Sequence, residues 1–398
     1  MRRKSLVGLI FFVLATCGNV SFATIADEQQ YSDSVSTTDD STGLKGFIRR
    51  IIGYFEKANQ PHPEKKFDIS FIGGPHYSNE AGFGLGIVGS GIYYTARDDN
   101  GMPDTQTPPS NVSLKLDVTT GQLYKIGADG YHVFGSDKFR INYDGYFYSF
   151  KDKFWGIGYS QAINDANESI FKRLQAQLKA DFVFNAGSGF YVGPLVQFSY
   201  VNATRVDRPE LFDGQQPRTF TTGIGFTACY DTRDVPFNAY KGVYIRYNQL
   251  FNPRFMGNTY AFSQSQFDIA GYATVWKGGV LAALFHADLT KGNTPWGLMP
   301  TFGDSGRMRG YYEGRFRDKN EMDVTLELRQ HVWRRNGIVV WVGAGTVFPR
   351  FSSFKWQHVL PNFGVGYRWQ FKPRINVRLD LGIGKGEKGF NFSINEAF

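Results

Sequence analysis

The chain of 398 residues carries 44 Lys and Arg against 36 Asp and Glu, a formal net charge of +8, with 17% aromatic residues, 46 glycines and only 20% charged residues. Beyond the first residues no stretch has the roughly 18 consecutive apolar residues of a membrane-spanning helix, which excludes a helical membrane protein. The small positive charge does not indicate nucleic-acid binding, and no residues have metal-ligand spacing, so we predict no metal and no cofactor.

Residues 1–23 have the pattern of a secretory signal peptide. Three cationic residues precede an apolar run, and small residues lead to a cleavage site after Ala23. A lipoprotein signal is the alternative, because the residues before Cys17 are similar to a lipobox. Removal of the three cations would lower the net charge from +8 to +5. It would also leave Cys229 as the only cysteine, so we expect no internal disulfide.

Two segments follow the leader. Residues 24–41 are polar and acidic, and they predict a disordered periplasmic tail. In residues 42–60 apolar side chains recur at helical spacing, which predicts a short amphipathic helix. We interpret this helix as a candidate barrel plug through Leu44, Phe47, Arg49, Ile51 and Phe55. The alternatives are attachment to the inner leaflet of the membrane and docking on a partner lipoprotein.

From residue 67 onward, apolar and polar residues alternate. The polar positions include full charges, which a wet lumen accepts and lipid rejects. About sixteen segments have the length of a tilted spanning strand, so residues 67–398 predict an all-β fold, a 16-stranded antiparallel transmembrane β-barrel of the outer membrane. The predicted strands are 67–75, 82–95, 110–119, 122–134, 138–150, 169–184, 189–201, 218–230, 241–250, 260–276, 278–290, 321–333, 337–348, 361–371, 374–384 and 388–396.

The connections agree with this count, because bacterial barrels alternate short periplasmic turns with longer outside loops. The predicted outside loops include 151–168, 202–217, 291–320 and 349–360. Most predicted inside turns are tight. Two of them, 97–109 and 231–240, are longer than the rule requires.

Residues 307–314, Arg-Met-Arg-Gly-Tyr-Tyr-Glu-Gly, resemble the Val-Arg-Gly-Phe/Tyr loop of the outer-membrane protein assembly factor superfamily, the BamA/TamA-like or bacterial surface antigen barrels. Further similar segments occur in the family's order at 75–86, 154–158, 230–242, 326–329, 343–348 and Phe398. The chain also departs from the family. Too few residues precede the barrel for a POTRA domain, so a POTRA-less member is expected. Gly343 stands where members often have Asp, and Glu396 interrupts the apolar alternation of the last strand.

The resemblance implies that Arg309 turns into the barrel and pairs with an acid on the inner wall. Glu327 is the predicted partner, because it lies on the polar face of strand 321–333. Gly310 would allow close backbone approach, with Tyr311 or Tyr312 packing beside the arginine. We call Arg309, Gly310, Tyr311 and Glu327 the barrel-lock residues. The alternative is a solvated basic loop that binds lipopolysaccharide phosphates.

At the predicted periplasmic rim, Asp231, Arg233 and Asp234 form a charged turn. The resemblance implies a structural clasp at the barrel mouth, while the residues alone are equally typical of a charged hairpin end.

The resemblance implies a non-enzymatic barrel that inserts or translocates polypeptides, or lipids, at the outer membrane. The expected partners are outer-membrane lipids and lipopolysaccharide, unfolded outer-membrane client proteins and a periplasmic or lipoprotein helper subunit. The alternative is a passive pore or small-molecule transporter that keeps only the scaffold. Hydrolysis is a minor alternative, since Gly-Asp-Ser-Gly at 303–306 is similar to a serine-protease motif but no His and Asp partners are recognisable.

Overall fold

The structure, a computed structural model, describes residues 67–78, 80–96, 107, 110–134, 137–236, 238–372 and 374–398. The predicted signal peptide (1–23), tail (24–41) and amphipathic helix (42–60) lie outside the described residues. Almost all of the long inside connection 97–109 lies outside them as well.

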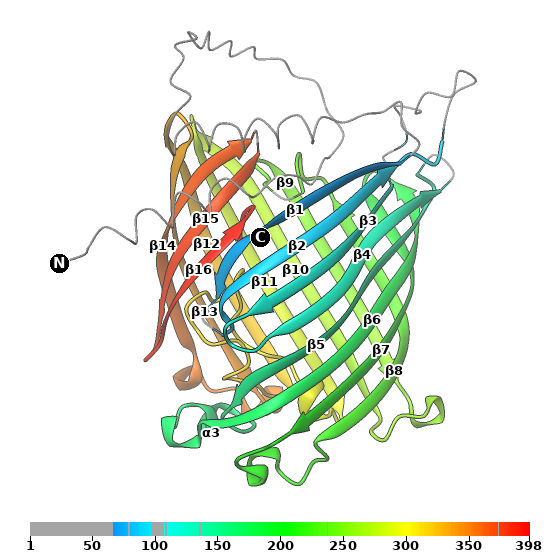
Figure 1. Cartoon of the computed structure of the whole chain (residues 1–398), viewed down its shortest axis with the longest axis vertical. Helices are drawn as coiled ribbons and strands as arrows, with labels where there is room; N and C mark the ends of the chain where they lie inside the picture. Colours follow the sequence, from blue (N-terminus) through cyan, green and yellow to red (C-terminus); the bar gives the residue numbers. More distant parts are fainter. Residues whose placement is uncertain are drawn as a thin grey trace, which may run out of the picture.

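Sixteen antiparallel strands form one closed barrel in which β1 neighbours both β2 and β16 (Figure 1). This confirms the predicted fold. The strands are β1 (Asp68–Ser78), β2 (Gly82–Tyr93), β3 (Ser110–Thr119), β4 (Tyr124–Phe134), β5 (Phe139–Phe154), β6 (Ser169–Gly187), β7 (Phe190–Thr204), β8 (Arg218–Asp231), β9 (Gly242–Asn252), β10 (Phe262–Trp276), β11 (Gly279–Gly292), β12 (Asn320–Trp333), β13 (Asn336–Phe348), β14 (Leu360–Lys372), β15 (Ile375–Gly384) and β16 (Lys388–Ile394).

Side chains along each strand alternate between the outer surface and the lumen. On β12, Val324 and Leu326 are 49% and 45% exposed, whereas Thr325 and Glu327 are 1% and 0% exposed. Successive side chains of a strand point to opposite faces, so the apolar set faces lipid and the polar set lines the lumen.

The connections after β5, β7, β9, β11 and β13 are long and carry the short helices, including α3 (Tyr159–Ala162), which lies at the lower end of the barrel in Figure 1. The other short helices are η1 (Asp165–Asn167), η2 (Pro209–Phe212), η3 (Arg254–Met256), η4 (Trp296–Leu298), η5 (Phe351–Ser353) and η6 (Trp356–His358). At the opposite end the turns after β4, β6, β10, β12 and β14 are short, which marks it as the periplasmic end, although the connections after β2 and β8 are longer. None of the helices in the described ranges is long and apolar enough to cross a membrane.

A buried apolar cluster belongs to the long connection between β11 and β12. This connection contributes five members, and the neighbouring loops and strands contribute the rest: Phe302, Met308, Tyr311, Tyr312 and Phe316, with Trp155, Ala162, Val347 and Leu360. Apolar side chains this well buried hold the connection against the barrel instead of leaving it in solvent.

Candidate functional site

The connection between β11 and β12 lies close to the barrel wall through three glycines, Gly310, Gly382 and Gly389, which we call the glycine floor. Gly310 has a φ of 113°, a backbone conformation that side chains rarely adopt. A Cβ on Gly382 of β15 would lie 1.9 Å from the Arg309 carbonyl oxygen, and a Cβ on Gly389 of β16 would lie 3.0 Å from the Gly310 Cα. Gly382 and Gly389 are paired across the two strands. Together these three glycines let the loop backbone lie directly on the wall.

Arg309 is fully buried and pairs with two carboxylates. Its Nη2 donates to Glu327 of β12, the predicted partner, and its Nη1 donates to Asp380 of β15 at 2.7 Å. Both carboxylates are 0% exposed. The guanidinium also lies 3.6 Å from the ring centroid of Trp341 in β13, a cation–π contact. One loop side chain therefore links three different strands.

The two tyrosines after Gly310 contact the wall at other points, and their packing beside the arginine stays a prediction. Tyr311 packs against Phe302, with ring centroids 5.1 Å apart, and its hydroxyl donates to the Pro361 carbonyl at 2.7 Å. The Tyr312 hydroxyl donates to Asp152 of β5 at 3.1 Å. These tyrosines tie the loop to the wall at other points.

The Arg309 contacts belong to a wider buried network that the sequence did not predict. Glu327 also accepts from Arg329 Nε at 2.7 Å, and Asp380 accepts from Arg368 Nη1 at 2.6 Å. Arg378 Nε lies 3.7 Å from Asp380. Shared carboxylates join the arginines into one network, which we call the lumen network: Arg309, Arg329, Arg368, Arg378, Glu327, Asp380 and Glu396.

Gly343 fits this arrangement. The position often occupied by Asp in the resembling family has no side chain here, and a Cβ would lie 3.2 Å from the Met308 sulfur. The second carboxylate on Arg309 comes instead from Asp380, two strands away. The resemblance therefore predicted an inward arginine but not the strand that supplies this partner.

A second inward contact lies nearer the start of the loop. Arg307 Nη1 donates to Asp323 of β12 at 2.7 Å, and Arg307 Nε donates to Asp304 at 3.2 Å. Burial acts to lower the pKa of Arg307, but Asp304, Asp323 and Glu321 outweigh it and raise the pKa above its ordinary range. Arg307 therefore stays charged among these acids.

The remaining loop arginines are also held by the protein. Arg315 Nη1 lies 2.8 Å from Glu387, and Arg315 Nη2 lies 2.6 Å from Asp165. Arg317 is 1% exposed, donates to the Trp296 carbonyl at 3.2 Å and lies over its ring. These contacts do not fit the alternative interpretation, in which the loop arginines form a solvated basic surface.

The chain after β16 turns into the lumen, which explains the break in apolar alternation at Glu396. Asn395 has a φ of 67°, which Asn tolerates better than most residues. Glu396 then accepts from Arg368 Nε at 2.8 Å. The Phe398 main-chain oxygen accepts from Arg329 Nη2 at 2.8 Å. The final residues thus join the lumen network.

The charged turn after β8 reaches across the periplasmic mouth. Asp231 and Arg233 pair with each other at 2.7 Å. Asp234 pairs with Arg374, in the turn between β14 and β15, at 2.7 Å. Arg374 Nη1 also donates to the Asn238 carbonyl at 3.0 Å. A simple hairpin end would make no such contacts, so we call residues 231–241 the strap.

The junction between the first and last strands is the weakest in the barrel. All 11 residues of β1 pair with β2, and all 7 residues of β16 pair with β15. Between β1 and β16, only Tyr77 and Phe392 are paired in the described residues. Most backbone groups along this seam therefore lack a strand partner on one side.

Comparison with known proteins agrees with this architecture. A family model described as the Omp85 superfamily domain matches residues 102–398. The fold is similar to BamA from Haemophilus ducreyi lacking POTRA domains 1-3, with a TM-score of 0.57 and 13% identity over 83% of this chain and 69% of that chain.

Two further solved structures are similar. CdiB from Acinetobacter baumannii has a TM-score of 0.52 and 11% identity over 83% of this chain and 60% of that one. CdiB from Escherichia coli has a TM-score of 0.54 and 10% identity over 84% and 63%. This chain thus spans less than two thirds of either CdiB chain. No match was found among curated proteins.

Proposed function

Because the chain belongs to the Omp85 superfamily, we propose that this integral outer-membrane barrel is a non-enzymatic factor for inserting or translocating polypeptides, or lipids, at the outer membrane. The observation that carries the proposal is the seam, where Tyr77 and Phe392 form the single pair between β1 and β16 in the described residues. An incompletely paired edge is a template for an additional strand.

The sequence of β1 favours such an edge. Gly73 and Gly74 are followed by Pro75, which has no backbone N–H to donate. Glycine and proline both weaken a strand interior. An incoming segment that pairs with this edge would compete only with the short contact to β16.

The barrel-lock residues would keep the other side of the seam in place. Arg309 connects β12 to β15, and Gly310 lies against Gly382 and Gly389 of β15 and β16. We therefore propose that β12–β15 form a fixed wall while β1 separates from β16. In this proposal the strap clasps the periplasmic end of the wall through Asp234 and Arg374.

The proposed partners are unfolded outer-membrane proteins, membrane lipids and lipopolysaccharide. A periplasmic or lipoprotein helper is also among the proposed partners. The helper would bring clients to the seam, and the barrel would supply the edge.

The proposal is tested by depleting the protein and measuring the outer-membrane proteome, alongside the conductance of the purified full chain in planar bilayers. We expect broad loss of other barrels, or loss of a secreted class of proteins, with little conductance. A large steady conductance with an unchanged proteome would overturn the proposal and favour a passive pore or small-molecule transporter.

A further inference from the structure

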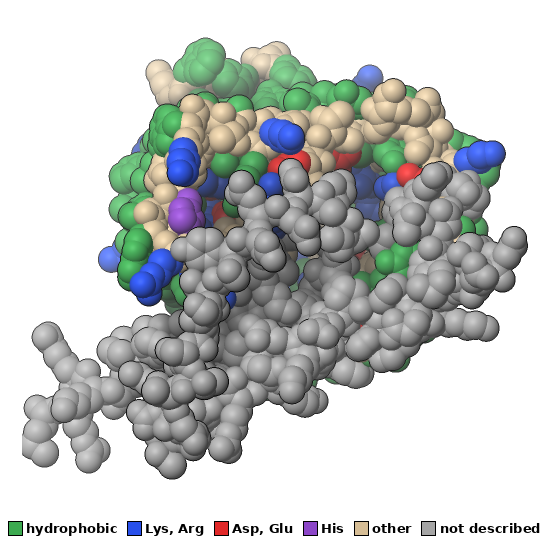
Figure 2. Space-filling model, turned by 90° about the horizontal axis from the view of Figure 1, so that it is seen from above, with side chains coloured by type: hydrophobic (Ala, Val, Ile, Leu, Met, Phe, Trp, Pro, Cys, Tyr) green, Lys and Arg blue, Asp and Glu red, His purple; other side chains and the backbone are tan. Residues whose placement is uncertain are grey.

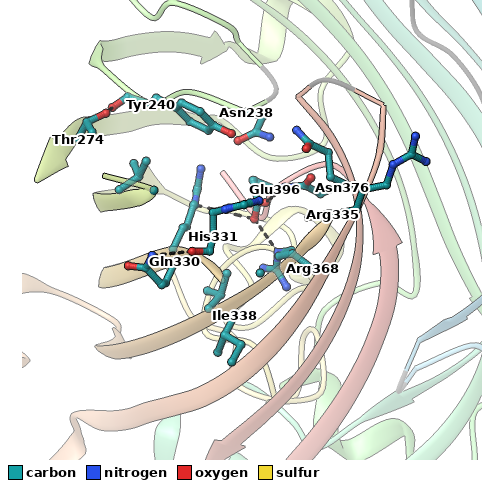
Figure 3. A pocket seen from close by; sticks show the side chains of 16 residues that line it. Asn238, Tyr240, Thr274, Gln330, His331, Arg335, Ile338, Arg368, Asn376 and Glu396 are labelled. Atoms are coloured by element: carbon teal, nitrogen blue, oxygen red, sulfur yellow. Dashed lines mark hydrogen bonds and ion pairs between the residues drawn. The ribbon is translucent and has the colours of Figure 1, made fainter. Parts of the chain in front are cut away.

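A cavity of about 220 Å³ lies at the periplasmic mouth, under the strap (Figure 3). Asn238 and Tyr240 of the strap line one side, and the other side is formed by Arg329 and Arg368 with Glu396. Figure 3 shows Arg368 and Glu396 joined by an interaction at the cavity wall. The strap, the tail and six strands, β10 to β15, therefore converge on one space.

Two buried guanidinium groups in this wall retain donors without an acceptor. Arg329 and Arg368 are only 6% and 4% exposed. Arg329 Nη1 and Arg368 Nη2 are buried and have no hydrogen-bond partner in the described part of the chain. Leaving a buried charged donor unpaired is costly, so these atoms favour an acceptor that enters the cavity.

The charge around the cavity also favours an anion. Arg329 and Arg368 line the cavity with one side-chain carboxylate, Glu396, and the Phe398 main-chain oxygen accepts from Arg329 Nη2. Arg335 adds an exposed cation to the cavity lining. Seen from this end, the mouth is hollowed, and Lys and Arg side chains lie inside it and around its rim, with Asp and Glu side chains beside them in the hollow (Figure 2).

We propose that this cavity binds a phosphate group presented from the periplasm. Arginine forks match phosphate oxygens bidentately, and a phosphate monoester has about 1.5 to 2 negative charges at pH 7 with several acceptor oxygens. Arg329 and Arg368 supply the buried donors, and Arg335 supplies a contact at the rim. The cavity is on the lumen side of β12–β14, so a soluble phosphate ester reaches it more directly than a lipid headgroup in the surrounding membrane.

The test titrates the full chain, purified in a phosphate-free maltoside detergent, with inorganic phosphate and with glycerol 3-phosphate, using calorimetry. Arg335→Gln removes the rim contact, and Thr274→Glu places a carboxylate in the cavity lining without touching the network. Arg334→Gln is the matched control, because Arg334 is exposed in the same turn but does not line the cavity.

We expect saturable binding to the unchanged protein. Arg335→Gln should weaken the binding about tenfold, the loss of one charge-assisted hydrogen bond, while Thr274→Glu abolishes it and Arg334→Gln leaves it unchanged. To identify the source, the chain is also reconstituted in vesicles of phosphatidylcholine with or without phosphatidic acid. If the folded chain is stabilised only in vesicles with phosphatidic acid, and this depends on Arg335, the site binds a lipid phosphate. If free phosphate binds in detergent, the site binds a soluble ester.

Two results would overturn the proposal. One is the absence of any binding or Arg335-dependent stabilisation with all of these probes. The other is equally strong binding of acetate or succinate, which would make the cavity a carboxylate site for a polypeptide or metabolite. Circular dichroism of each variant verifies that the barrel remains folded, so loss of binding is not loss of structure.

Discussion

Arg309, in the loop after β11, donates to Asp380 of β15 at 2.7 Å, although the two residues are 71 positions apart. The contact joins the loop to β15, the strand that pairs with β16. Removing one partner of a buried ion pair typically costs about 3 to 5 kcal/mol, because the other charge remains buried and unpaired.

Arg309→Ala and Asp380→Ala should therefore each lower the temperature at which the folded barrel loses its compact mobility on a detergent gel. Arg309→Ala with Glu327→Ala should cost less than the sum of the two single changes, because both remove the Arg309–Glu327 contact, while the contacts of Arg309 with Asp380 and of Glu327 with Arg329 are each lost in one single change. Arg350→Ala is the control, because Arg350 is an exposed loop arginine. Equal heat resistance of Arg309→Ala and Arg350→Ala would show that no lock exists.

The glycine floor gives a second prediction. Gly382→Ala should displace the loop, because the new Cβ would lie 1.9 Å from the Arg309 carbonyl oxygen. The matched control is Gly271→Ala in β10, where a Cβ would meet no atom within 4 Å. Protease cleavage within residues 303–319 measures the displacement. We expect faster cleavage for Gly382→Ala alone, and similar rates in both variants would contradict the close packing.

Much of the fold follows from the sequence, because period-two alternation is a local property of each strand. The inward position of Glu327 could be predicted in the same way, since the alternation places it on the polar face of its strand. Asp380 could not be predicted in this way, because no local sequence pattern specifies which strand a loop contacts inside the barrel. The inward position of Trp341 could not be predicted, because residues 338–342 are all apolar and show no alternation between the two faces of the strand. Asn395 did offer a signal, since Asn is enriched in left-handed turns and the following Glu396 breaks the alternation.

The inward turn of the tail gives a third prediction. Asn395→Gly should be tolerated, because glycine adopts the observed φ of 67° readily. Asn395→Val should cost about 1 to 3 kcal/mol, since a β-branched residue is strained there, and should release Glu396 from Arg368. Urea unfolding of the refolded barrel measures both changes. Equal stability of the two variants would mean that the tail does not need this turn.

The strap should loosen in acid. Partial burial acts to raise the pKa of Asp234, but hydrogen bonds from the Tyr240 and Lys241 main chain and the charge of Arg374 hold it below the ordinary value of 3.8. A depressed pKa contributes stability at neutral pH that begins to fall below the ordinary value and is lost once the pH passes the folded-state pKa. The protection factor within residues 231–241, which compares the exchange rate with that of the unfolded chain at the same pH, should therefore fall below about pH 4.

Asp234→Asn should lower the protection factor in this way already at pH 7, with a loss of about 1 kcal/mol in local stability. Asp213→Asn, at an exposed position in an outside loop, is the control and should change nothing in the strap. Protection of the strap that is independent of pH and of Asp234 would mean that the contact with Arg374 does not hold it.

The most direct measurement of the central claim is the activity of a barrel whose seam is locked by a disulfide. Ser78→Cys and Asn391→Cys, one residue beyond the pair Tyr77 and Phe392, are introduced into a Cys229→Ser background. The control disulfide, Ser90→Cys with Ser113→Cys, joins β2 and β3 at directly opposed residues. Each variant replaces the native protein in cells, and the outer-membrane and secreted proteins are quantified with and without reductant. We expect the oxidised seam variant to reproduce the depletion phenotype, with recovery on reduction and no defect in the control. Full activity of the oxidised, cross-linked seam variant would contradict the account.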